Sequence, residues 1–228
     1  MKTVAIALDG PAGAGKSTIA RALAKEMEYI YVDTGALYRA VGYYMLEKGV
    51  EPNDADAVIP LLEGLDVSLR FVDGEQQVML NGENVSGMIR TPAVSMAASA
   101  VSAIPTVRQF LFDLQQNMAK TNNVIMDGRD IGTVVLPWAQ VKIFLTASPE
   151  ARAKRRYVEL IEKGEQVNFD DVLADMKKRD YDDSHRAIAP LKPADDAVIA
   201  DTSDITLEES IALLKSIAKE RLSCQNIL

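Results

Sequence analysis

The sequence predicts an α/β fold in which helices cover a parallel sheet of five strands and a small antiparallel lobe interrupts the series. Short apolar runs alternate with amphipathic stretches along the chain, and this alternation is typical of βαβ units. Residues 64–92 contain two runs of period-two patterning separated by turn residues, which indicates an inserted hairpin. The length of 228 residues suits one such domain.

The chain begins with a strand–helix–strand–helix pattern. Thr3–Asp9 is a short apolar run, as expected for a strand buried on both faces of a parallel sheet. It leads through a glycine-rich segment into an amphipathic stretch that ends near Met27. Tyr29–Val32 is expected to form the second strand and Ala36–Lys48 the second helix.

The middle of the chain has a different pattern. Val67–Phe71 and Gln77–Leu80 alternate and are separated by turn residues 73–75, and Asn81-Gly82 offers a second turn. We expect two helices to follow, at Ala93–Ser102 and at Ile104–Asn117, the latter with Pro105 in its first turn.

The last part returns to the βαβ pattern. Three further strands are expected at Val124–Asp127, Val141–Leu145 and Ala197–Ala200. Ser148-Pro149 should begin one helix, and the capping box Thr206–Glu209 should begin another. Residues 224–228 are expected to form a loose tail.

Composition excludes several classes of protein. Apolar residues make up 48% of the chain, and no apolar run reaches the ~18 residues that a membrane-spanning helix needs. The single cysteine, Cys224, excludes an internal disulfide or a cysteine-cluster metal site. We therefore expect a cytoplasmic protein.

Charge is unevenly distributed. The 25 basic and 33 acidic residues give a net charge of −8, which argues against a long nucleic acid as the main ligand. Ten of the 25 basic residues nevertheless fall within residues 152–192, together with nine acidic ones. This concentration favours a small, highly charged anion, although a solvated pair of charged helices would have the same composition.

The glycine-rich segment matches the phosphate-binding P-loop. Gly10-x-x-x-x-Gly15-Lys16-Ser17 has a buried-type strand before it and a helix after it, which is the context the motif requires. Glycines let backbone N–H groups turn toward phosphates, Lys16 supplies a point charge and Ser17 a hydroxyl for Mg²⁺. The alternative is a glycine-rich turn with an exposed lysine.

A second candidate site residue, Asp127, ends an apolar strand and opens the polar loop Gly128-Arg129-Asp130. Ligands of open α/β sheets bind at that strand end, where a carboxylate can order the shell of Mg²⁺. A carboxylate that merely caps a turn is the alternative.

A P-loop indicates nucleotide binding but no particular activity. The Asn-Lys-x-Asp element of a GTPase is absent, and the chain has more arginines than one triphosphate requires. These features favour a kinase that binds two phosphorylated molecules, while a P-loop switch that hydrolyses nucleotide slowly remains the alternative. The arginines in question are Arg39, Arg108, Arg129, Arg152, Arg155, Arg156, Arg179 and Arg186.

Together these segments resemble the bacterial cytidylate kinase family, the CMP and dCMP kinase branch of the nucleoside monophosphate kinases. The resemblance extends from Val4 to about Ser203. The motifs that carry it are Asp9–Thr18, Asp33–Arg39, Val85–Thr91, Asp127–Val135, Lys142–Ser148, Arg179–Arg186 and Pro190–Ala197. Position 34 is threonine where some members have serine, so the hydroxyl is retained.

The resemblance implies a three-layer, P-loop NTPase-type fold with a core at about residues 1–63, 93–150 and 187–222. It implies an inserted monophosphate-side lobe at about 64–92 and a helical lid at about 151–186. The implied reaction, part of pyrimidine nucleotide metabolism, moves the γ-phosphoryl group of ATP to CMP or dCMP with Mg²⁺ and without a general base. The implied protein is a monomer that binds neither a nucleic-acid polymer nor a membrane.

The resemblance also implies roles for individual residues. ATP would be bound by Gly10, Pro11, Ala12, Gly13, Ala14, Gly15, Lys16, Ser17, Thr18 and Arg152. CMP would be bound by Thr34, Arg39, Ser99, Arg108, Arg129, Asp130, Asp183 and Arg186. The residues implied to act in catalysis are Lys16, Arg129, Arg156, Arg179 and Arg186. Mg²⁺ would be held directly by Ser17 and through water by Asp127 and Asp33. His185 is expected to be a surface residue of the lid.

Overall fold

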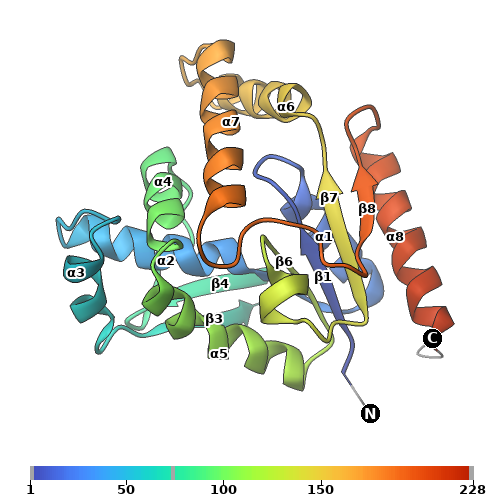
Figure 1. Ribbon diagram of the computed structural model, residues 1–228, viewed down its shortest axis with the longest axis horizontal. Coiled ribbons are helices and arrows are strands. Elements are labelled where there is room, and N and C mark those ends of the chain that lie inside the picture. The colour runs from blue at the N-terminus through green and yellow to red at the C-terminus, as the bar shows by residue number, and fades with distance from the viewer. Residues whose placement is uncertain (1–2, 73–74, 226–228) are drawn as a thin grey trace.

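The computed structural model describes residues 3–72 and 75–225. Its main sheet has five parallel strands in the order β2-β6-β1-β7-β8 (Figure 1). They are β1 (Ala5–Asp9), β2 (Ile30–Asp33), β6 (Val124–Gly128), β7 (Val141–Thr146) and β8 (Val198–Asp201). Leu8 pairs with Asp127 and Asp33 also pairs with Asp127, so β1, β2 and β6 end at one edge. The predicted parallel sheet is confirmed.

Helices cover both faces of this sheet, as its alternating side chains require. Ile6 and Leu8 of β1 pack in the apolar cluster that α1 (Lys16–Met27) and α8 (Leu207–Cys224) share with the sheet. Ala5 and Ala7 face the other way, into a cluster that includes residues of α5 (Pro105–Thr121) and of the π-helix η2 (Ile131–Val135).

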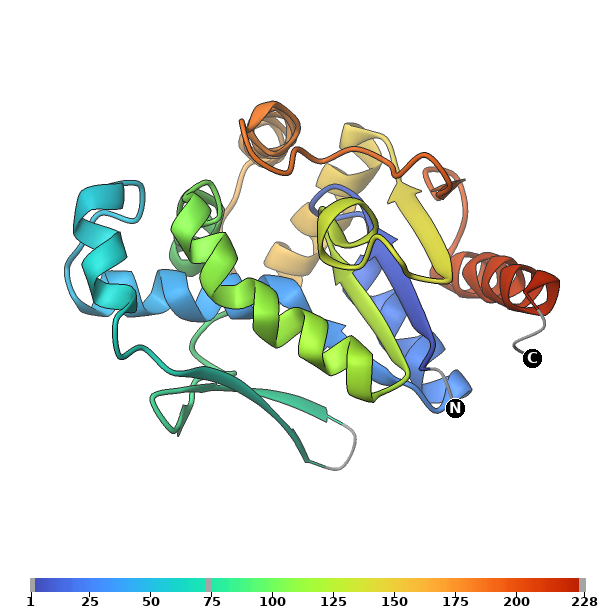
Figure 2. The same ribbon diagram turned by 60° about the horizontal axis from the view of Figure 1, so that its bottom comes forward.

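A second, antiparallel sheet of three strands lies beside α2 (Thr34–Glu47), as Figure 2 shows. Its strands are β3 (Val67–Val72), β4 (Glu75–Leu80) and β5 (Glu83–Asn84). Asn81 and Gly82 have φ values of 50° and 85°, the left-handed pair that a tight hairpin turn between β4 and β5 requires. The hairpin predicted from alternation is confirmed, while residues 73–74 of its other turn lie outside the described residues.

The second sheet and four helical elements bury a common core against α2. These elements are α3 (Ala55–Val58), η1 (Ile59–Leu62), α4 (Pro92–Val101) and the first part of α5. Gly42 of α2 lies so close to α4 that an added Cβ would be 2.8 Å from the backbone nitrogen of Ala98. A side chain at position 42 would therefore push the two helices apart.

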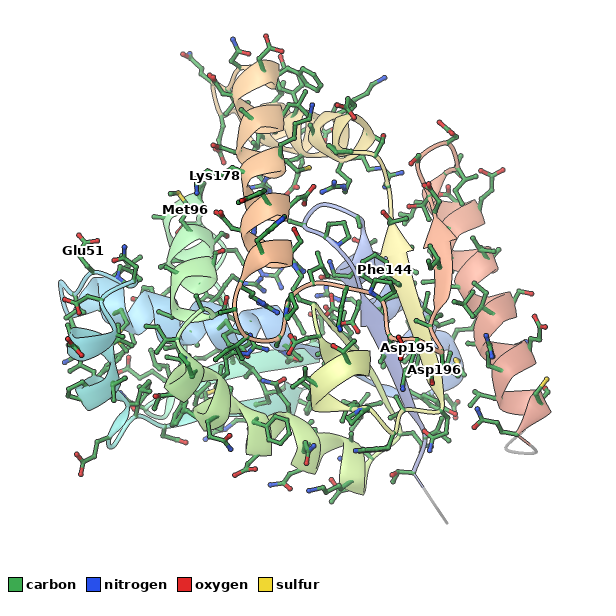
Figure 3. All side chains as sticks on the ribbon, viewed as in Figure 1. Glu51, Met96, Phe144, Lys178, Asp195 and Asp196 are labelled. Atoms are coloured by element: carbon green, nitrogen blue, oxygen red, sulfur yellow. The ribbon has the colours of Figure 1, made fainter. Side chains whose placement is uncertain are left out.

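Two charged helices, α6 (Pro149–Glu162) and α7 (Phe169–His185), stand over the carboxyl ends of β1 and β7 (Figure 1). Ser148 and Asn168 cap them by accepting hydrogen bonds from backbone N–H groups of their first turns. After α7 the chain returns to β8 through a segment that carries Asp195 and Asp196 (Figure 3). Lys142 of β7 binds Asp196 at 3.0 Å and so ties this segment to the sheet.

The expectation of a loose tail is wrong for its first residues. The helix α8 continues through Cys224, and the side-chain amide of Gln225 donates to the carbonyl oxygen of Gln140 at 2.9 Å. Residues 226–228 lie outside the described residues. Along the described part of the chain, no helix is both long and apolar enough to cross a membrane.

Candidate functional site

The P-loop lies between β1 and α1 in a backbone conformation that needs glycine. Gly10 has a φ of 152°, and a Cβ there would overlap the carbonyl oxygen of Leu145 on β7. Gly13 and Gly15 have φ values of 73° and 85°, so the loop turns its backbone inward before α1 begins. The first N–H groups of α1 then add the positive end of the helix dipole, as a phosphate site requires.

Lys16 is buried in this loop, with only 6% of its surface exposed. Its Nζ donates a hydrogen bond to the carbonyl oxygen of Pro11 at 2.7 Å. Burial lowers the pKa of Lys16 well below its ordinary value, and the positive charge of Arg129 lowers it further. A charged lysine in this position is stabilised by any anion that enters the loop.

Two carboxylates lie at the neighbouring strand ends. Asp127 accepts hydrogen bonds from the hydroxyl of Ser17 at 2.8 Å and from the phenol of Tyr31 at 3.2 Å. Burial raises the pKa of Asp127 to about 6, and the negative charge of Asp33 adds to the rise. Asp33 caps α2 through the N–H of Ala36 at 2.9 Å.

These groups fit a magnesium ion by their chemistry. A hydroxyl and two carboxylates are the hard oxygen donors that Mg²⁺ prefers, and the hydrogen-bond donors given above for Asp127 are neutral hydroxyls. Within residues 3–72 and 75–225, no three His, Cys, Asp or Glu side chains are grouped as a metal cage. A magnesium ion here would take its remaining ligands from phosphate and water, as it does in kinases.

The first two turns of α2 carry Thr34 and Arg39, the residues predicted to hold an acceptor phosphate. Arg39 pairs with Asp33 at 2.7 Å, and its buried Nε has no hydrogen-bond partner among the described residues. Thr34 is buried, and its hydroxyl donates to the carbonyl oxygen of Asp127 at 2.7 Å. The two side chains thus lie at the same strand edge as the P-loop. The hydroxyl of Thr34 already donates its hydrogen bond within the protein.

The predicted base-reading residues form a buried ionic group. Asp130 is ion-paired with Arg108, and Arg186 lies 3.3 Å from its other carboxylate oxygen. The guanidinium of Arg108 also lies over the ring of Tyr38, 5.6 Å from its centre. Ser99 is half-buried on α4, one turn before Ser102, whose carbonyl oxygen accepts from Arg108 at 3.2 Å.

Arg129, in the loop after β6, and Arg179 of α7 approach this group. Arg129 binds Asp183 at 2.7 Å, which lowers the pKa of Asp183 in spite of its burial. The buried Nε of Arg179 has no partner among the described residues. Burial lowers the pKa of Arg179 to about 10, and repulsion by Arg129 contributes. Such an excess of buried positive charge is stabilised by an anionic ligand.

Arg152 and Arg156 of α6 differ in their surroundings. Arg152 is 2% exposed; it binds Asp180 of α7 with both terminal nitrogens, at 2.9 and 2.5 Å, and the carbonyl oxygen of Ala12 in the P-loop at 3.0 Å. Arg156 is half-exposed and pairs with Glu159 on its own helix at 2.9 Å. Arg152 therefore connects both α6 and α7 to the P-loop.

His185 lies on the surface of α7 and stacks on Tyr181, with the ring centres 4.0 Å apart. This side chain is therefore on the surface, as the sequence predicted.

Asp9 is a residue of the site to which the sequence analysis assigned no role. It is buried at the end of β1 and accepts from the N–H groups of Ile131 and Gly132 at 2.8 and 2.7 Å. These bonds hold the loop that follows Asp130. Burial outweighs them and raises the pKa of Asp9 to about 6. The signal in the sequence was the position of Asp9, which is the single acidic residue of β1 and ends that strand.

Comparisons with known proteins show which family and which fold the chain is similar to. The family described as cytidylate kinase matches residues 6–220. The chain is 51% identical over 209 residues to a cytidylate kinase of Caldicellulosiruptor saccharolyticus, covering 92% of each chain. It is 49% identical over 219 residues to a cytidylate kinase of Pasteurella multocida, covering 96% of each. A crystal structure of an uncharacterized protein from Eubacterium ventriosum covers 96% of this chain with a TM-score of 0.50 and 16% identity, and this likeness concerns the fold alone.

Proposed function

Because the chain belongs to the cytidylate kinase family, we propose that it transfers the γ-phosphoryl group of ATP to CMP or dCMP, giving ADP and CDP or dCDP. The observation that carries this proposal is the excess of arginines beyond the P-loop. Arg39 and Arg129 lie close enough to Arg179 to add to the lowering of its pKa by burial, and together the three would form a second anion site, which a protein that only binds or hydrolyses ATP would not need.

In the proposed mechanism, positioning and charge neutralisation carry the reaction. Phosphoryl transfer spreads negative charge over the transferred oxygens, so cations placed around them stabilise the transition state. Lys16 would contact the outer phosphates of ATP, while Arg129, Arg179 and Arg186 would neutralise the group in transit. Arg156 would join them when the lid closes. The proposed mechanism requires no side chain to act as a general base.

Magnesium would be held directly by Ser17 and through water by Asp33 and Asp127, and it would supply positive charge that neutralises the phosphates. The support is the oxygen donor set and the two neighbouring carboxylates, whose mutual repulsion adds to burial in raising the pKa of Asp127. The hydroxyl of Ser17 donates to Asp127, so its oxygen keeps lone pairs for the ion.

Asp130, Arg108 and Ser99 would read the cytosine base. The pairing edge of cytosine presents one amine donor and two acceptors, so a carboxylate can accept from the amine while Arg108 and Ser99 donate to the acceptors. Asp183 would bind the acceptor ribose. Arg152 would act at the ATP side by tying the lid to the P-loop, to which it already bonds.

We expect Asp130→Ala to narrow the preference for CMP over UMP. Uracil presents an oxygen where cytosine presents its amine, so removing the carboxylate lowers kcat/KM for CMP much more than for UMP, by about 1–3 kcal/mol in transition-state free energy. The measurement is kcat/KM for both nucleotides in both proteins. Equal proportional losses would mean that Asp130 only balances Arg108 and Arg186.

A P-loop switch that hydrolyses nucleotide slowly is the second candidate function. A coupled assay for ADP formation separates the two, run with ATP alone and with ATP plus CMP, dCMP, UMP, AMP or GMP. A kinase forms ADP rapidly only with an acceptor, and CMP and dCMP should be the best. Equal rates with and without every acceptor would support the switch.

We further propose that the enzyme is a cytoplasmic monomer that acts in pyrimidine nucleotide metabolism. Its ligands would be ATP and CMP or dCMP, and neither a nucleic-acid polymer nor a membrane would be a partner. The acidic net charge of −8 and the single cysteine support this setting. We also propose the division into a core, the monophosphate-side lobe at about 64–92 and the lid at about 151–186.

A further inference from the structure

The strand β2 is an edge strand of the main sheet, and its last residue is bonded by a side chain. β6 lies on one side of β2, so the outward N–H and C=O groups of β2 need other partners. At Asp33, the side-chain amide of Gln76 on β4 supplies both partners. Its Oε1 accepts from the Asp33 N–H at 2.9 Å, and its Nε2 donates to the Asp33 carbonyl oxygen at 3.4 Å.

The direction of Gln76 follows from the packing of its strand. Side chains alternate along β4, so Gln76 shares a face with Val78 and Leu80. Val78 and Leu80 are buried in the core that the lobe shares with α2. Gln77 lies on the opposite face of β4. Burial of two apolar neighbours therefore directs the Gln76 amide toward β2.

Asp33 in turn organises the acceptor side of the site. One carboxylate oxygen caps α2 through the N–H of Ala36 at 2.9 Å, and the other holds Arg39 at 2.7 Å. The next residue, Thr34, binds the Asp127 carbonyl oxygen at 2.7 Å. Movement of the Asp33 backbone would therefore shift the first turn of α2 and change the aim of Arg39.

We propose that Gln76 is a positioning residue, through which the inserted lobe fixes Asp33 and so orients Arg39 toward the acceptor monophosphate. This inference rests on the proposed function for its effect on turnover. It gives the lobe a role in the site although its strand β4 contributes no residue to the predicted nucleotide-binding set. Arg39 would contact the acceptor phosphate in the ground state and in the transition state alike, so its misalignment weakens acceptor binding rather than the chemical step.

The test compares Gln76→Met with Gln77→Met. Methionine is close to glutamine in length and keeps the packing, while both hydrogen bonds of Gln76 are lost. We expect Q76M to raise KM for CMP about three- to tenfold, with kcat and KM for ATP nearly unchanged. Q77M should behave as the wild type, because its side chain lies on the other face of β4. Equal KM values for CMP in the two variants would overturn the proposal.

Amide hydrogen exchange provides a readout that needs no substrate. Q76M should speed exchange at Asp33 and in the first turn of α2, while Q77M should not. If the wild-type protein transferred no phosphoryl group to CMP, the proposed function would fail, yet faster exchange confined to Q76M would still support the positioning role. Unchanged exchange at Asp33 in Q76M would overturn it.

Discussion

Buried charge is the main property of the individual side chains at this site. Lys16 and Arg179 are cations whose pKa values burial lowers, and Arg129 repels both of them. Asp127 and Asp9 are carboxylates whose pKa values burial raises to about 6. Such groups destabilise a protein unless a ligand compensates them, so their concentration at one strand edge supports the proposal that phosphates and a metal ion bind there.

Replacing Lys16 by methionine should abolish phosphoryl transfer while leaving the fold intact. Methionine keeps most of the buried volume but removes the charge that stabilises the outer phosphates, and the loss of one such group costs about 100-fold or more in kcat. Steady-state kinetics and a thermal unfolding curve are the two measurements. Near-normal turnover by a folded Lys16→Met protein would contradict the P-loop assignment.

Asp9 should make stability depend on pH in a defined direction. In the folded protein Asp9 keeps its proton up to about pH 6, whereas the unfolded chain releases it near the ordinary value of 3.8. The folded state therefore binds more protons between these values, and the stability due to Asp9 falls as pH rises through this window. As pH rises through this window, the unfolding free energy of the wild type should fall by roughly 1–3 kcal/mol relative to that of Asp9→Asn.

Urea unfolding of both proteins at several pH values from 4 to 7, without nucleotides, measures this difference, and the other titrating groups cancel in the comparison. A difference between wild type and Asp9→Asn that stays constant over the range would contradict the assignment of the raised pKa to Asp9.

The helices α6 and α7 act together because side chains join them to each other and to the core. Arg152 binds Asp180 and Lys177 binds Glu150 between the two helices. Arg129, in the loop after β6, binds Asp183 of α7. These contacts are few compared with the apolar packing that holds α1 and α8 on the sheet. The lid is therefore the element whose order should change most with ligands.

Amide exchange across residues 151–186 should slow when both nucleotides are bound. In the proposed mechanism, closure would bring the arginines of this segment onto the phosphates and would exclude the water that could otherwise accept the phosphoryl group. The comparison is exchange of the free protein and of its complex with an analogue that joins both nucleotides, with α8 as internal reference. Equal protection of residues 151–186 in the two states would argue against a lid.

Most regular elements follow from local patterns, and the exceptions have physical reasons. Buried apolar runs predicted the five parallel strands, and the capping residues Ser148 and Thr206 predicted helix starts. The π-helix at Ile131–Val135 has no local signal, because the buried carboxylate of Asp9, distant in sequence, bonds its first N–H groups. The extension of α8 through Cys224 was missed because no residue there marks a helix end.

In the whole molecule, the parallel topology collects the site at one edge. β1 ends at Asp9, β2 at Asp33 and β6 beyond Asp127, so residues far apart in sequence meet where open α/β sheets bind ligands. The motifs predicted which residues would gather there. They did not predict the pairing of Arg108 with Asp130 or the contact of Gln76 with Asp33, because both depend on how separate elements pack.

The activity proposed for this protein is the movement of a phosphoryl group between two nucleotides. Its decisive test supplies ATP that is radiolabelled in its γ-phosphate, together with Mg²⁺ and CMP, and separates the products by chromatography. We expect the label to appear in CDP as ADP forms, with little in inorganic phosphate. Label found in inorganic phosphate at the same rate with and without CMP would contradict it.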